Sequence, residues 1–417
     1  MRKICFILIA ASFLVCCSTM ASFADWQLAD GHKMHFPQLP DEDGWDVNAT
    51  KPLVLADDFQ CAETGWITDI HFWGSWLGGF TGTIVSFTLS IHEDIPADPP
   101  LIPHSRPGPT VWEREIVAES PGVEIVYIPP TDPPVSEGWY DPTMPPPLYP
   151  DHNEYFQYNV FLDKEDWFWQ EEGKIYWLNI SANVQNVDPP APQPVWGWKS
   201  SADHWNDDAV WGEWEWPLLD WTDMYEPSEP SQSLDLSFVI TGHGEDFGDA
   251  PDPTYPTLQA SNGASHVITA GYFLGASVDP EPNGQQDPNA MGDDNDGNDD
   301  DDGVVFTSVL VRGRTANLTV TASAIGLLDA WVDFNDDGDW TDPGEQIFTN
   351  QPLVAGANAL SFVVPKTAKP TKQTFARFRF SSTGSLAPGG LAADGEVEDY
   401  EVAIRSILSW LFLLLGD

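Results

Sequence analysis

Short runs of β-branched and aromatic residues, separated by proline, glycine and aspartate, recur along most of this chain. No long segment keeps the 3.6-residue period of an amphipathic helix. Residues 86–91 instead alternate polar and apolar side chains, as a strand with one buried face does. Strands without crossover helices pair with antiparallel neighbours. The pattern therefore predicts an all-β protein made of two antiparallel β-sandwich domains, of the jelly-roll or immunoglobulin-like type.

Tryptophan divides the chain into two parts, because 17 of the 20 tryptophans lie before residue 222. We expect a Trp-rich sandwich over residues 25–242 and a second, smaller all-β domain over 243–405. The strand-like segments in the two parts are 66–73, 83–91, 110–117, 123–128, 155–162, 174–184, 195–199 and 234–241, then 314–323, 360–364, 373–381 and 396–404. A short apolar tail, 406–417, follows; its apolar run is well below the roughly 20 residues that a spanning helix needs.

The first 24 residues have the layout of a secretory signal peptide. Arg2 and Lys3 precede an apolar stretch over 4–15, and small residues at Ser22 and Ala24 predict cleavage after Ala24. A lipoprotein signal that uses Cys16 or Cys17 is the alternative. Either way we expect a secreted, extracellular or cell-surface protein. Cys61 would be the one cysteine left after cleavage, so no internal disulfide could stabilise the mature chain.

The chain is strongly acidic, with a formal net charge of −48 at pH 7. Nucleic-acid binding requires a basic surface, so this charge argues against a nucleic-acid partner. We also expect no membrane span in the mature chain. Self-repulsion at this charge destabilises a compact state, and divalent cations or high external salt would relieve it.

Residues 333–341 form the best local motif. Asp or Asn side chains stand at alternate positions, and Gly338 permits a sharp turn. Calcium binds six to eight hard oxygens, which such a loop can supply. The spacing departs from an EF-hand because the terminal acid is one residue late, and the flanks 330–332 and 346–349 look like strands. A turn without an ion is the alternative. The predicted calcium ligands are Asp333, Asn335, Asp337, Asp339 and Glu345.

An acidic run over 293–303 offers a weaker version of the same spacing. Asn298, Asp300, Asp302 and Gly303 fit it, although Asn is a poor first ligand. We take Asp300 and Asp302 as further candidate metal ligands. A solvated, flexible linker is the alternative explanation for such a charge run.

Six blocks of the C-terminal part resemble the GEVED domain of bacterial secreted and surface proteins. They lie at 246–252, 275–279, 299–304, 330–338, 376–380 and 395–400, and the last contains Gly-Glu-Val-Glu-Asp. The resemblance implies a β-sandwich and suggests one that is stabilised by metal. It implies no enzymatic activity, and it makes the acidic run part of the domain.

The N-terminal part resembles an uncharacterised domain of bacterial exported proteins. The blocks that carry this resemblance are 56–59, 69–76, 138–141, 176–178, 197–199 and 204–212. The resemblance supports a domain boundary and an exterior location, but it implies no mechanism.

One segment of the N-terminal part combines histidine, acids and tryptophans. A metal or a sugar could bind there, but a structural loop with hydrogen-bonded polar groups is the commoner outcome. Tryptophans 73, 76, 198, 205 and 211 could likewise form a sugar-stacking platform or lie in the core. The candidate ligand-binding residues are His204, Trp205, Asp207, Asp208 and Trp211.

The sequence has no His-Glu-x-x-His zinc motif, Gly-x-Ser-x-Gly elbow or phosphate loop, so we expect no catalysis. We expect instead a structural or adhesive protein of the cell exterior, stabilised by calcium. Its partners would be extracellular matrix, a cell-surface protein or a polysaccharide. An extracellular carbohydrate-binding protein that uses the Trp-rich domain is the alternative.

Overall fold

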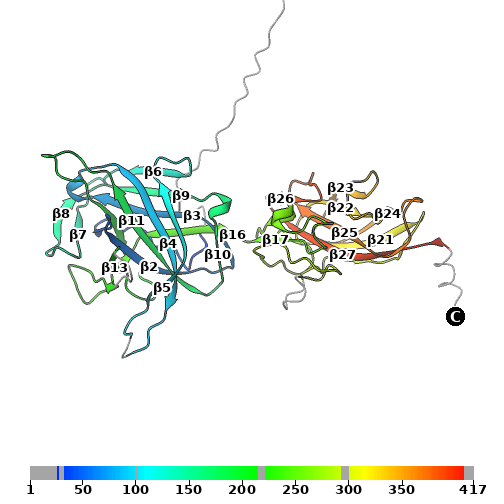
Figure 1. The fold of residues 1–417 in the computed structure, drawn as a ribbon, viewed down its shortest axis with the longest axis horizontal. Helices are drawn as coiled ribbons and strands as arrows, with labels where there is room; N and C mark the ends of the chain where they lie inside the picture. The colour runs from blue at the N-terminus through cyan, green and yellow to red at the C-terminus, as the bar shows by residue number, and fades with distance from the viewer. Residues whose placement is uncertain (1–25, 28–31, 100–101, 215–220, 293–299, 408–417) are drawn as a thin grey trace, which may run out of the picture.

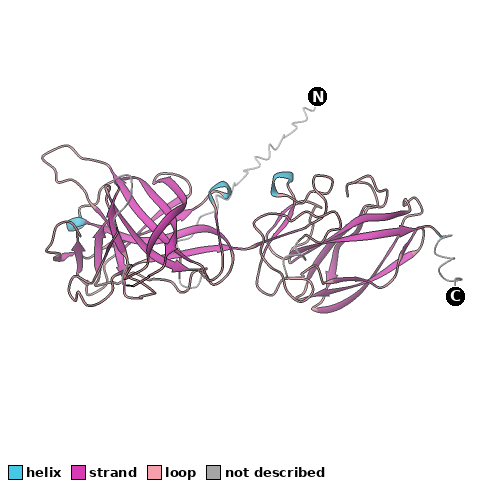
Figure 2. Cartoon of the chain, turned by 60° about the horizontal axis from the view of Figure 1, so that its bottom comes forward, coloured by secondary structure: helices cyan, strands magenta, loops and turns pink. Residues whose placement is uncertain are grey.

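The computed structural model describes residues 26–27, 32–99, 102–214, 221–292 and 300–407. The predicted signal peptide and nearly all of the apolar tail lie outside these ranges. The described chain is all-β, as predicted, and forms two groups of sheets (Figures 1 and 2). Its short helices are single 3-10 turns: η1 (Leu77–Gly79), η2 (Lys164–Asp166) and η3 (Gln259–Ser261).

The N-terminal domain contains two large sheets. The first has the strand order β6-β9-β3-β12-β1-β7-β8, and β10, β15 and β16 pair onto its central strands. Its strands are β1 (Trp45–Asn48), β3 (Gly65–Trp76), β6 (Val123–Ile128), β7 (Glu137–Tyr140), β8 (Leu148–His152), β9 (Tyr155–Phe161), β10 (Phe168–Gln170), β12 (Trp196–Ser201), β15 (Asp235–Leu236) and β16 (Phe238–His243).

The second sheet of this domain has the order β14-β13-β2-β11-β4-β5. Its strands are β2 (Leu53–Gln60), β4 (Ile84–Ile95), β5 (Arg106–Val117), β11 (Ile175–Val184), β13 (Val210–Glu213) and β14 (Thr222–Asp223). Strands β4 and β11 pair over nine registered positions and lie at the centre of the sheet. The strand-like segments predicted from the sequence all fall on strands of one sheet or the other.

Aromatic side chains fill the core between these two sheets. Phe87 of β4 contacts Phe72 of β3 and Trp196 of β12, with ring centroids 5.1 and 5.2 Å apart. The indole N–H of Trp196 donates to the Tyr158 hydroxyl at 2.9 Å, so the largest buried rings also satisfy their polar atoms. Trp73, Trp76 and Trp198 lie in the same core. Most of the predicted sugar-stacking platform therefore belongs to the core.

The C-terminal domain contains a five-stranded sheet and two three-stranded sheets. The orders are β20-β27-β25-β22-β23, β19-β21-β24 and β17-β18-β26. Their strands are β17 (Glu245–Phe247), β18 (Ala264–Val267), β19 (Val304–Phe306), β20 (Leu310–Val311), β21 (Thr315–Ala322), β22 (Gly326–Val332), β23 (Gln346–Leu353), β24 (Gly356–Val363), β25 (Thr371–Ser381), β26 (Gly390–Ala392) and β27 (Glu396–Arg405).

Both faces of the five-stranded sheet are covered. On β25, Ala376, Phe378 and Phe380 point into the core shared with the β19-β21-β24 sheet. Phe375 lies on the opposite face and joins a smaller cluster with Trp340 and Tyr255. The second face is thus covered by loop residues that include Ala250, Tyr255 and Ala290.

Most strand pairs are antiparallel, as expected, but three are parallel. These are β1 with β7, β18 with β26 and β20 with β27. In each of these pairs at least one strand is four residues long or shorter, so the parallel pairing is limited to short strands. The chain passes from one domain to the other between β16 and β17 (Figure 2).

Candidate metal centres

The predicted calcium loop connects β22 to β23. Asp333 follows β22 directly, and Glu345 immediately precedes β23, so both ends of the loop are fixed by the hairpin. Asp333, Asp337 and Glu345 each offer a carboxylate oxygen, and these three oxygens lie within 4.8 Å of one another. Asp333 and Glu345 are buried, whereas Asp337 is exposed. Three of the five predicted ligands therefore converge.

Hydrogen bonds orient the two buried carboxylates. The Tyr255 hydroxyl and the Gly338 amide donate to Asp333 Oδ2 at 2.6 and 3.0 Å. The Phe334 amide donates to Glu345 Oε1 at 2.9 Å. Gly338 has φ +95°, a conformation that glycine adopts without strain. The turn therefore aims the loop amides inward and brings Asp337 back over the two ends.

The electrostatics of this loop favour a cation. Burial raises the pKa of Glu345 to about 7, and the neighbouring Asp333 carboxylate raises it further against the hydrogen bond from Phe334. Two carboxylates held this closely repel one another when both are charged. A divalent cation between them would remove that repulsion.

The other two predicted ligands occupy different positions. The Asn335 amide group donates to Asp337 and to Asp342, at 2.9 and 2.5 Å, and so braces the rim of the loop. Asp339 is half-buried and accepts hydrogen bonds from the amide and hydroxyl of Thr341, both at 2.7 Å, which lower its pKa. Asp339 lies outside the converging set of acidic oxygens.

A second acidic cluster lies where the C-terminal domain begins. Asp246 of β17, Glu281 and Asp300 place oxygens within 4.8 Å of one another, and all three are buried. Asp300 is a ligand predicted from the acidic run, but Asp302 lies outside this set and accepts a hydrogen bond from the Ala276 amide at 2.9 Å. Asn298 lies outside the described residues.

Two glutamates of β27 adjoin this cluster. The Leu274 amide donates to Glu396 Oε2, and the Gly303 amide donates to Glu398 Oε1 at 2.6 Å. Burial raises the pKa of Glu398 to about 8, against the hydrogen bond from Gly303. Burial and the adjacent Glu398 and Asp246 charges raise the pKa of Glu396 well above its usual range.

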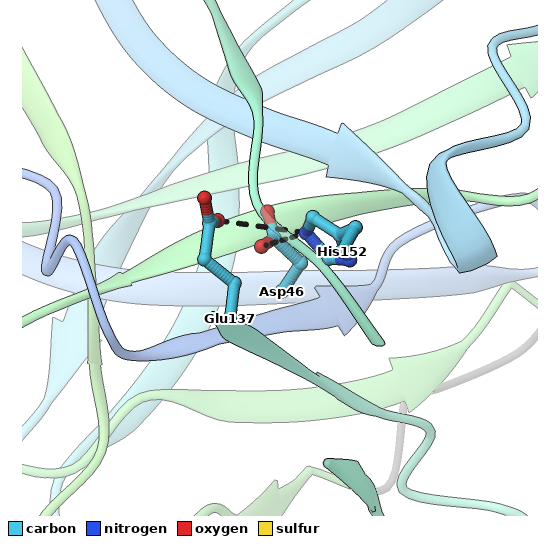
Figure 3. A group of neighbouring side chains, drawn as sticks. All are labelled: Asp46, Glu137 and His152. Carbon is cyan, nitrogen blue, oxygen red and sulfur yellow. Dashed lines mark hydrogen bonds and ion pairs between the residues drawn. The ribbon is translucent and has the colours of Figure 1, made fainter. Parts of the chain in front are cut away.

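A third cluster lies in the N-terminal domain, where Asp46, Glu137 and His152 meet (Figure 3). This cluster already contains cationic side chains. Lys199 Nζ lies 2.5 Å from Glu137 Oε2 and 3.7 Å from Asp46 Oδ2. Burial lowers the pKa of His152, but hydrogen bonds to Asp46, Glu137 and Asp151 outweigh it and raise the pKa to about 10. A metal would have to displace Lys199, so this cluster is an internal ion network.

The predicted ligand-binding segment of the N-terminal domain rests on a buried aspartate. Asp235 accepts the Trp205 amide at 2.8 Å and lies 3.3 Å from His204 Nδ1. The Trp205 ring stacks on His35 with centroids 4.1 Å apart. These contacts are those of an anchored loop, with His204 at the surface.

The remaining members of this segment are also engaged. Asp207 accepts the Ser105 amide at 2.9 Å, and Trp211 of β13 packs against the main core. Burial raises the pKa of Asp208. Burial likewise raises the pKa of Asp58, which accepts from Asn206, to about 8.

Comparison with known families supports the division of the chain into an N-terminal and a C-terminal domain. Residues 327–403 match the GEVED domain, and residues 34–241 match a domain of unknown function, DUF7901. The chain contains a GEVED domain. A DUF7901 domain precedes it. No curated protein matches the chain. Among the described residues, no helix is long and apolar enough to cross a membrane.

The geometry explains the motif that names the GEVED domain. Gly395 has φ +100°, and a Cβ atom there would lie 1.8 Å from the Phe380 carbonyl oxygen. Asp399 accepts two hydrogen bonds from the Arg377 guanidinium, at 2.7 and 2.6 Å. Because neighbouring strand residues face opposite sides, the motif serves both faces of β27: the glutamates face the acidic cluster and Asp399 faces Arg377.

Sequence reasoning missed several members of these clusters. Asp246 and Glu398 lie in the blocks that carry the GEVED resemblance, so that resemblance could have identified them as candidate site residues. Glu281 stands in a loop without motif or periodicity. Lys199 looks like any strand lysine until its neighbours across β12 are known.

Proposed function

We propose that this protein is a structural or adhesive binding protein of the cell exterior, stabilised by calcium and without catalytic activity. The observation that carries the proposal is the convergence of Asp333, Asp337 and Glu345 within 4.8 Å. The signal-like N-terminus and the acidic composition support the exterior location. Its partners would be matrix, a cell-surface protein or a polysaccharide.

The donor chemistry of this loop suits calcium. All three converging groups are carboxylates, and calcium prefers hard oxygen ligands at 2.3–2.6 Å. Asp333 and Glu345 stand at the two ends of the loop, so one ion would join β22 to β23. An ion that binds only the folded hairpin stabilises the fold, which matters in a domain without disulfides.

The surface beside the loop can bind a partner. A hollow of about 560 Å³ is lined by residues that include Asp336, Asp337, Asp252, Asp287 and Tyr255. Calcium held at Asp337 would lie at the rim of this hollow. A partner carboxylate or hydroxyl could then complete the coordination of the ion.

Calcium titration of the full-length chain tests the proposal. We expect chelator-treated protein to bind calcium in isothermal titration, and the Asp337→Asn variant to lose the site formed by this loop. Asp98→Asn, at an exposed aspartate of the DUF7901 domain, is the control and should bind as wild type does. If Asp337→Asn binds calcium with unchanged affinity and stoichiometry, the loop is only a turn and the proposal fails.

Carbohydrate binding by the DUF7901 domain is the alternative proposal. It is supported by the surface position of His204 and by the partial exposure of Trp205 and Trp211. A glycan array of the full-length protein, with and without calcium, separates the two. Binding that is lost in Trp205→Ala would favour the sugar role. The absence of any glycan signal would leave the structural or adhesive role.

A further inference from the structure

Three carboxylates from distant parts of the chain meet at the base of the GEVED domain. Asp246, Glu281 and Asp300 are 2%, 2% and 4% exposed, and their oxygens lie within 4.8 Å of one another. Buried carboxylates are strongly disfavoured unless a cation or a set of donors compensates their charge. Three so close together require more compensation than one does.

Each of the three accepts a hydrogen bond from a backbone amide. The Val397 amide donates to Asp246 Oδ2 at 2.7 Å, and the Phe247 amide donates to Glu281 Oε2 at 3.0 Å. The Asp279 amide donates to Asp300 Oδ2 at 3.1 Å. These hydrogen bonds orient the three carboxylates and hold the segments that carry them in place.

A fourth carboxylate gives independent support for a bound ion. Glu396 is 1% exposed, and its Oε1 atom has no hydrogen-bond donor among the described residues. The Leu274 amide holds the other oxygen, Oε2. The charges that act on this carboxylate include Asp246 and Asp300, which places it beside the cluster. A buried oxygen without a donor is rare in folded proteins and calls for an unseen partner.

The nearest basic side chains are directed elsewhere. Arg379 donates Nε–H to His266, and its four remaining N–H groups go to the backbone carbonyls of Ala387, Gly389, Ser265 and Gly390. Lys164 of the DUF7901 domain bonds to Glu245, at 2.9 and 3.3 Å from its two carboxylate oxygens. The adjacent Glu245 carboxylate thus has a lysine as its partner, whereas all five N–H groups of Arg379 are engaged by other acceptors.

We propose that Asp246, Glu281 and Asp300, with Glu396 as a further ligand, bind a second divalent cation of the hard, oxygen-preferring class, such as calcium. This site is separate from the loop at Asp333 and does not depend on it. It joins β17, the loop at Glu281 and the start of the segment that leads into β19.

The site also borders the junction between the two domains. The Glu281 amide donates to the Glu245 carbonyl at 2.8 Å, and the Glu245 side chain holds Lys164. The cation would therefore fix the first strand of the GEVED domain at the point where it contacts the DUF7901 domain.

Native mass spectrometry of the full-length chain tests the site. After chelation and titration with calcium, we expect two bound ions for wild type and one each for Glu281→Gln and Asp337→Asn. The double variant should bind none. Glutamine keeps an oxygen that can accept the Phe247 amide, so the substitution removes charge and preserves shape. Circular dichroism checks the fold, and Asp300→Asn replaces Glu281→Gln if that variant fails to fold.

The outcomes separate this proposal from the proposed function. One ion in wild type, lost in Asp337→Asn and kept in Glu281→Gln, overturns the second site and leaves the calcium loop intact. Two ions retained in both Glu281→Gln and Asp300→Asn show that these residues are not the ligands. One ion in wild type that is lost only in Glu281→Gln supports the second site and overturns the loop instead.

Discussion

The two domains handle buried charge in different ways. In the DUF7901 domain, Asp46 and Glu137 are fully buried beside Lys199 and His152, so the protein supplies its own counter-charges. At the base of the GEVED domain, buried carboxylates adjoin other carboxylates. The first arrangement is complete when the chain has folded. In the second, we propose that an ion from solution compensates the charge. The contrast predicts that one domain responds to basic-residue substitutions and the other to calcium.

The largest effect should come from removing the internal cation of the DUF7901 domain. Lys199→Met leaves Glu137 and Asp46 buried without their lysine. Breaking a buried pair by removing one partner costs about 3–5 kcal/mol. We expect the free energy of unfolding, measured in urea, to fall by that amount, with or without calcium.

Lys174→Met is the matched control for that substitution. Lys174 pairs with Glu93 at 3.1 Å, but both side chains are about two-fifths exposed. Exposed pairs contribute only about 0–1 kcal/mol. Equal losses in the two variants would mean that burial does not decide the effect and that the comparison between the domains is wrong.

Calcium should produce the next largest effect, and only in the GEVED domain. An ion that binds only the folded state stabilises it by about 2.7 kcal/mol at a hundredfold excess over its dissociation constant. We therefore expect chelator to lower the thermal unfolding transition of this domain. Tryptophan fluorescence reports mainly on the other domain, because 17 of the 20 tryptophans precede residue 222. That signal should change little on chelation.

Raising the pH should weaken the DUF7901 domain through His152. Its pKa in the folded protein is about 10, above the roughly 6.5 of an unfolded histidine. The stabilisation is complete below about pH 6.5 and is lost as the pH rises toward 10. At about 1.4 kcal/mol per pH unit, stability should fall by about 2 kcal/mol between pH 7 and 8.5. His152→Gln should be less stable and nearly flat over this interval; a wild-type curve that is equally flat would rule out a charged His152.

The sequence predicted the fold class, and it predicted three of the carboxylates that converge in one loop, because both depend on local patterns. Alternation in 86–91 and in 373–381 is a property of neighbours along the chain, and the structure has strands there. Asp333, Asp337 and Glu345 stand within one loop, so their convergence needs only a turn.

The rest was not predictable because it depends on contacts between distant segments. Asp246 and Asp300 are 54 positions apart in the sequence, and no local pattern indicates that their carboxylates converge. Lys199 meets Glu137 across two pairings, β12 with β1 and β1 with β7, and the second is parallel. The short strands β17, β18 and β26 lack enough residues for a recognisable period.

The smallest predicted effect concerns two aspartates two positions apart in one loop. The spacing along the sequence predicts that Asp337 and Asp339 are equivalent calcium ligands. In the structure, Asp337 belongs to the converging set, whereas Asp339 is half-buried and accepts hydrogen bonds from Thr341 within its own turn. We expect Asp339→Ala to change stability by at most about 0.5 kcal/mol, as surface substitutions usually do. The calcium affinity of Asp339→Ala should stay close to that of wild type, while Asp337→Ala should lose the site.

Titration calorimetry of both variants under one set of conditions makes the comparison. A loss of affinity in Asp339→Ala as large as that in Asp337→Ala would mean that the loop rearranges around its ion and that spacing along the chain, not the geometry described above, identifies the ligands.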